Sequence, residues 1–125
     1  MALVLDAGGL IAIDRLDRKV GAILRIVQQE NLPVRTSAAV VAQVWRNGAR
    51  QANLARVLAG VDSAPLDGTT GKLVGEILAG SATADVVDGH LGFIVRTGDT
   101  VVTSDVADIR RILSARKIDA TVHHA

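Results

Sequence analysis

The chain of 125 residues has no cysteine, which excludes disulfides, thiolate catalysis and cysteine-ligated zinc together. Its only aromatic residues are Trp45 and Phe93, or 2% of the chain, so we do not expect it to bind single strands by stacking bases on aromatic rings. No run approaches the ~18 to 20 apolar residues that cross a bilayer. A metal ion, if one is bound, must be held by oxygen or histidine.

The chain also lacks an excess of either charge, with 14 basic and 13 acidic residues and a net charge of +1. Arg46, Arg50 and Arg56 are candidates for a local basic stripe, whose contacts to a nucleic acid would be mainly to phosphates. The first residues, MALVLDAGG, lack a basic leader and reach an acid at Asp6, so we expect no signal peptide and a cytoplasmic protein. With 49% apolar residues, the sequence predicts one folded domain over residues 1–125.

Short apolar runs alternate with segments of helical periodicity along the chain. The apolar runs predict strands at residues 3–5, 32–36, 61–66, 99–103 and 121–123. The periodic segments predict helices at residues 10–17, 20–29, 38–47, 53–58, 70–78, 84–98 and 106–117, with Ser37 and Asp67 as N-caps. This alternation is typical of an α/β fold, with a parallel sheet of four to five strands flanked by helices on both faces.

Three aspartates stand beside the apolar runs. Asp6 closes LVLD, Asp105 closes TVVTSD, and Asp88 opens DGHLGF. Sites in parallel sheets form outside the carboxyl ends of the strands, near a switch in strand order, and carboxylates gathered there can hold a hard divalent cation. The alternative for Asp6 is a turn residue or a cap of the next helix.

Two of these aspartates have an acidic neighbour three residues away, Asp85 before Asp88 and Asp108 after Asp105. Like charges at this spacing share a helix face and are mildly unfavourable without a cation. Each pair also has a structural explanation, as first-turn acids that complement the helix macrodipole or as a capping box. Asp88 is the better candidate ligand of its pair, because Gly89 follows it and would let a substrate approach.

Other polar residues carry weaker indications. Thr103 is a strand-end residue whose hydroxyl could orient a carboxylate or hold a water on a metal. His90, on an apolar helix, is expected to be buried or half-buried rather than a ligand. The segment GTTGK at residues 68–72 is similar to the end of a phosphate loop, but the required earlier glycine is absent and Leu73 stands where serine or threonine is needed.

Four segments together resemble PIN-domain ribonucleases, and more closely the VapC toxins of bacterial toxin–antitoxin pairs. They are VLDAGGLIA at 4–12, SAAVVAQVWR at 37–46, DVVDGHLG at 85–92 and VVTSDVADI at 101–109. The resemblance implies a sheet flanked by helices, a Mg²⁺ or Mn²⁺ site and endonucleolytic cleavage of RNA. It also implies a homodimer that a VapB-like antitoxin inhibits.

Carried over motif by motif, the resemblance makes Asp6, Asp88 and Asp105 the acids of the metal site. Asp108 becomes a further acid around it, and Thr103 a supporting hydroxyl. The chemistry would be metal-assisted hydrolysis of a phosphodiester, with one or two ions and no nucleophilic side chain.

The sequence departs from the family pattern at Gln43, where the family has a glutamate. Glutamine is nearly the same size and its carbonyl can still coordinate, but it brings no negative charge. Arg46 is expected one turn further along the same helix face, where it would contact a substrate phosphate or stabilise the site without RNA. The alternative function is therefore a catalytically inactive PIN module that retains antitoxin or RNA binding.

Two further classes share the alternating architecture and an acidic pocket. A phospho-receiver domain would have adjacent acids after the first strand and a lysine after the last strong strand, where this chain has Ala7-Gly8 and Val106 beside its aspartates. A phosphatase of the haloacid-dehalogenase type would need an aspartate at position 8, which is glycine. The sequence disfavours the first and excludes the second.

Overall fold

A computed structural model describes all residues, 1–125, and shows an α/β fold built on a five-stranded, all-parallel sheet. The strand order is β3-β2-β1-β4-β5. The strands are β1 (Leu3–Leu5), β2 (Val34–Ser37), β3 (Asp62–Ala64), β4 (Thr100–Thr103) and β5 (Thr121–His124). The expected fold class is therefore confirmed, and the segment at residues 121–124 is an edge strand as predicted.

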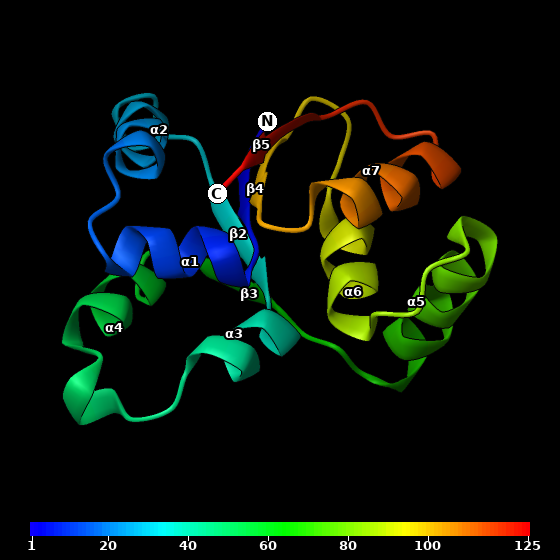
Figure 1. The fold of residues 1–125 in the computed structure, drawn as a ribbon, viewed down its shortest axis with the longest axis horizontal. Coiled ribbons are helices and arrows are strands. Elements are labelled where there is room, and N and C mark those ends of the chain that lie inside the picture. The colour runs from blue at the N-terminus through cyan, green and yellow to red at the C-terminus, as the bar shows by residue number, and fades with distance from the viewer.

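Helices cover both faces of the sheet, which Figure 1 shows nearly edge-on. One layer holds α1 to α4 and the other holds α5 to α7. Their bounds are α1 (Ala7–Asp14), α2 (Arg18–Gln29), α3 (Ala38–Val44), α4 (Ala52–Leu58), α5 (Gly68–Ser81), α6 (Val86–Ile94) and α7 (Val106–Ala115), with a 3-10 turn η1 (Gly48–Arg50). Every residue of the central strand β1 is fully buried, as a strand covered on both faces requires.

The strand order reverses between β1 and β4, which lie side by side in parallel. Asp6 follows β1 directly, and Ser104 and Asp105 follow β4, so both segments leave the sheet at the same edge. Figure 1 shows α3 leaving β2 at this lower edge too. The fold thus gathers the ends of three strands at the switch point, where ligand sites of open α/β sheets form.

The first helix begins at Ala7, three residues earlier than expected, and no separate turn precedes it. Asp6 is its N-cap, and the side-chain Oδ1 accepts a hydrogen bond of 2.9 Å from the amide of Gly9. Glycine is required here by close approach: a Cβ on Gly8 would lie 2.7 Å from Oγ of Ser104, and one on Gly9 3.0 Å from the carbonyl of Val102. The two glycines therefore let α1 pack against the end of β4 rather than break it.

The third helix also differs from the expectation, because α3 ends at Val44 rather than at Asn47. The side chain of Gln51 folds back onto this end. Its Nε2 donates to the carbonyl of Val44 at 2.8 Å, and its Oε1 accepts from the amides of Arg46 and Asn47 at 2.8 and 2.9 Å. These bonds satisfy the groups that a continuing helix would have paired, and the chain turns into η1 instead.

The remaining boundaries shift by a few residues. Helix α6 is shorter than predicted and stops at Ile94, because the buried carboxylate of Asp99 accepts from the amides of Arg96 and Ala2 at 2.8 Å each and holds the connection to β4. Helix α5 is longer, beginning directly after its predicted cap Asp67. No helix combines the length and the apolar character that crossing a membrane demands.

Candidate metal centre

Three carboxylates from two helices meet at the switch-point edge of the sheet. Asp88 lies in the first turn of α6, Asp105 at the N-cap position of α7, and Asp108 in the first turn of α7. Carboxylate oxygens of the three side chains all lie within 4.8 Å of one another. Such a set of oxygen ligands from adjacent elements matches the needs of a hard divalent cation.

The capping role offered by the sequence does not account for this cluster. Asp105 occupies the N-cap position of α7, yet its side chain makes no capping hydrogen bond. In α6 the cap is Asp85, whose Oδ1 accepts from the amide of Asp88 at 2.9 Å. Asp85 is thus engaged in capping, whereas the carboxylate of Asp105 remains available to the cluster.

Asp88 shows the electrostatic consequence of the arrangement. One of its carboxylate oxygens, Oδ2, is buried and has no hydrogen-bond partner. Burial, followed by the adjacent carboxylate of Asp105 and the charges of Asp85 and Asp108, raises the pKa of Asp88 from 3.8 to about 8. A cation between the carboxylates would give the buried oxygen a partner and reverse the repulsion, so the residues present fit a divalent metal ion.

Asp6 lies beside this group but is held differently. Its side chain is buried, and the two oxygens together accept from the amide of Gly9, the hydroxyl of Thr103 and the amide of Ser104. The hydroxyl of Thr103 in turn accepts from the amide of Asp105 at 2.9 Å. Thr103 therefore connects Asp6 to Asp105. The structure brings Asp88, Asp105 and Asp108 together, and Asp6 is not among these three.

Gln43 lies in α3 and Arg46 follows this helix, whereas the acidic cluster is carried by α6 and α7. Gln43 is exposed in the last turn of α3. The expectation that Arg46 continues the same helix face is wrong, because α3 ends before it. Its guanidinium donates to the carbonyls of Ala42 and Trp45, both at 2.7 Å, and so covers the exposed end of the helix.

His90 is fully buried, in agreement with the sequence, but its partner Ser37 was not foreseen. The hydroxyl oxygen of Ser37 lies 2.5 Å from Nδ1 of His90. Burial lowers the pKa of His90, and the Pro65 carbonyl acts in the opposite direction. Ser37 and His90 do not form a nucleophile and base, since the buried serine oxygen already caps α3 by accepting from the amides of Ala39 and Val40.

Asp108 lies closer to the other carboxylates than we expected from the sequence. It was expected only around the site, whereas the structure makes it a full member of the cluster. The spacing of three residues from Asp105 was the available indication, because it puts both carboxylates on one side of the first turn of α7.

Comparison with known proteins agrees with this architecture. No family model and no curated protein matches the sequence. Among solved structures, one similar chain belongs to the crystal structure of VapBC2 from Rickettsia felis bound to a DNA fragment from their promoter. The likeness covers 100% of this chain and 99% of that chain, with a TM-score of 0.68 at 15% sequence identity. The protein has a PIN-like fold.

This finding confirms the fold that the four sequence segments implied. The PIN-like fold extends over the whole described chain, including the helices that carry the acidic cluster. At this level of identity the likeness concerns the fold, and activity must be argued from the residues of the site.

Proposed function

We propose that the protein is a metal-dependent endoribonuclease, the toxin of a toxin–antitoxin pair, with residues 1–125 forming one PIN domain. The observation that carries the proposal is the group of Asp88, Asp105 and Asp108, with a buried carboxylate oxygen that no protein donor satisfies. The location of this group at the switch point of a PIN-like fold supports the same reading. RNA would be met in the cytoplasm, where we expect the protein to act.

The chain's own residues divide the work of such a site. Asp88, Asp105 and Asp108 would hold Mg²⁺ or Mn²⁺, while Asp6 adds negative charge behind them and fixes the start of α7 through Thr103. The ion, when bound, would polarise the scissile phosphate and lower the pKa of the attacking water. No protein nucleophile is needed, which agrees with the burial of Ser37 and His90.

A cognate VapB-like antitoxin is the partner we propose. The support is the likeness to a chain of a VapBC2 complex. A basic side chain of the antitoxin inserted among the three carboxylates would replace the positive charge of the metal. The exposed apolar residues Ile11, Leu16 and Ile26 on or beside α1 and α2 would suit the rest of such a contact. We also propose that the toxin is a homodimer.

The proposal is tested by RNA cleavage and calorimetric metal titration on the purified chain. We expect cleavage in Mg²⁺ or Mn²⁺ that stops in chelator, and its loss together with metal binding in Asp105→Asn. Asp119→Asn, which removes an exposed carboxylate outside the cluster, is the matched control and should retain both. Metal binding that is unaffected by Asp105→Asn would overturn the assignment of the site.

The second candidate is an inactive PIN module that binds its antitoxin without cleaving RNA. The neutral, exposed Gln43 at the position where the family has a glutamate favours it. Metal binding and antitoxin binding without cleavage, followed by cleavage in Gln43→Glu, would select this alternative. Cleavage by the unmodified chain would exclude it.

A further inference from the structure

A hollow lies between the sheet and the helical layer formed by α5, α6 and α7, and none of the clustered acids lines it. It has a volume of about 530 Å³ and opens between β2, β3, α6 and the end of α7. Helix α6 leads from the cluster at its first turn to this hollow at its far end, where Arg96 follows the helix.

Positive charge dominates the lining. Three arginines, Arg35, Arg96 and Arg116, come from β2, from the end of α6 and from the end of α7. A single carboxylate opposes them, that of Asp62, which stands next to Arg35 in the register of β2 and β3. Three positive charges against one negative charge leave the hollow with a net charge of +2 from these side chains.

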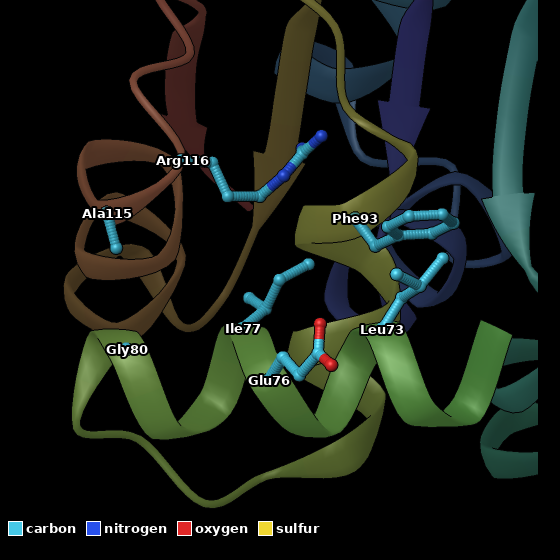
Figure 2. A pocket seen from close by; sticks show the side chains of 7 residues that line it. All are labelled: Leu73, Glu76, Ile77, Gly80, Phe93, Ala115 and Arg116. Carbon is cyan, nitrogen blue, oxygen red and sulfur yellow. The ribbon is translucent and has the colours of Figure 1, made fainter.

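Arg116 is held in place without losing its charge to a carboxylate. Its Nη1 donates to the carbonyls of Gly92 and Val95 at 2.6 and 3.0 Å. The guanidinium carbon lies 5.8 Å from the centre of the Phe93 ring, and Figure 2 shows the side chain extending from α7 across α6. Phe93 and Arg116 also line the neighbouring cavity between α5, α6 and α7, which Figure 2 shows. Nε and Nη2 of Arg116 remain as donors for a ligand.

His90 adds a buried ring nitrogen that makes no hydrogen bond of normal geometry in the protein, although the Pro65 carbonyl lies near the ring as a competing acceptor. The Ser37 hydroxyl oxygen already accepts from two amides, so its own proton points to Nδ1 of His90. Nδ1 is therefore an acceptor, and the proton of the neutral ring sits on Nε2. Nε2 is buried without a hydrogen-bond partner, on a ring that lines the hollow and is 0% exposed. An unpaired buried N–H is costly unless a ligand accepts from it.

We infer that this hollow is a second binding site, distinct from the acidic cluster, that takes a phosphate group. The donors converge from four elements, and the hydroxyl of Thr70 at the start of α5 joins them. A phosphate offers several oxygens and a charge near −2, which match these donors and the net charge; a carboxylate, with two oxygens, would leave several donors unused. The phosphate is either free or part of an RNA backbone.

The test follows the imidazole nitrogens of the full-length, isotope-labelled protein by NMR while inorganic phosphate is added at constant ionic strength in chelator. The chain has three histidines, so His123 and His124 serve as internal references. We expect a saturable change at Nε2 of His90 and none at the other two. No change at His90, or one that chloride reproduces at equal ionic strength, would overturn the inference.

Two matched charge removals make the test specific. Arg96→Gln removes an exposed arginine of the hollow and should weaken phosphate binding by at least about tenfold, whereas Arg110→Gln, on the exposed side of α7, should leave it unchanged. Equal weakening by both would mean unspecific attraction and would overturn the site. Titration with a short single-stranded RNA identifies the source of the phosphate. If the RNA binds far more tightly than inorganic phosphate, and Arg96→Gln weakens both equally, the site takes a backbone phosphate. If the RNA binds no more tightly, the site takes free phosphate.

Discussion

Replacing Asp88 by asparagine removes a carboxylate whose surroundings raise its pKa from 3.8 to about 8, and it nearly preserves the side-chain size. Between these two pH values the folded, metal-free protein holds a proton on Asp88 that the unfolded chain has released. The folded state therefore binds more protons than the unfolded state, and the free energy of unfolding falls as the pH rises through this interval. Asparagine does not titrate, so the variant lacks this loss.

The magnitude follows from the two pKa values. A difference of about four between them would correspond to about 5.5 kcal/mol at 1.36 kcal/mol per pKa unit. Asp88 is only half-buried, and water screens its interactions with the neighbouring carboxylates. We therefore expect about 2 kcal/mol. In chelator, the difference in the free energy of unfolding between Asp88→Asn and the unmodified protein should shift by this amount, in favour of the variant, when the pH is raised from about 4 to about 9.

The assay is urea unfolding of both proteins at the two pH values, with chelator and with Mg²⁺. Mg²⁺ at a hundred times its dissociation constant should stabilise the unmodified protein by about 2.7 kcal/mol and Asp88→Asn by much less. Asp119→Asn serves as the control for loss of a charge elsewhere. Parallel pH profiles for the unmodified protein and Asp88→Asn, together with equal stabilisation by Mg²⁺, would refute the reasoning about the cluster.

Three further changes test the surroundings of the site. Gln43→Glu should tighten Mg²⁺ or Mn²⁺ binding by roughly fivefold in calorimetry and raise RNA cleavage, because it adds a negative charge that attracts the cation; the gain is modest because position 43 is exposed and water screens this charge. Equal affinity and cleavage would place position 43 outside the site. Thr103→Val should cost about 1 to 3 kcal/mol in urea unfolding, because it removes one of the three donors to the buried carboxylate of Asp6, and Thr103→Ser should restore most of it. Gly8→Ala should destabilise by about 1 to 3 kcal/mol through contact with Ser104, whereas Gly75→Ala, which meets nothing within 4 Å, should be neutral or stabilising.

The strands β1 and β4 could be predicted because they are short apolar runs, LVL and TVVT, with few alternatives. The runs at residues 3–5 and 99–103 are separated by most of the chain, yet alternation with helices was enough to predict that both belong to one parallel sheet. The ends of helices were harder. The stop of α3 at Val44 depends on the side chain of Gln51, seven residues later, and no local pattern reports such a contact.

The start of α1 shows the same limit in another form. Two consecutive glycines after Asp6 predict a turn by intrinsic propensity, since glycine weakens a helix by about 1 kcal/mol each. Packing against the end of β4 overrides this propensity, because a side chain at Gly8 or Gly9 would collide with Ser104 or Val102. Tertiary contact, rather than local preference, sets this boundary.

The sequence does not show which acids of the site region accept hydrogen bonds from the protein. These acids are Asp6, Asp88, Asp105 and Asp108. Asp6 and Asp105 both follow a strand and both begin a helix, so their local patterns are nearly the same. The structure treats them in opposite ways: Asp6 accepts three hydrogen bonds from the protein, while Asp105 makes no capping bond and faces Asp88, whose Oδ2 has no donor. A carboxylate that the protein already neutralises needs no cation, whereas a group of three without donors does. The metal should therefore sit toward Asp88, Asp105 and Asp108, with Asp6 acting behind it through Thr103.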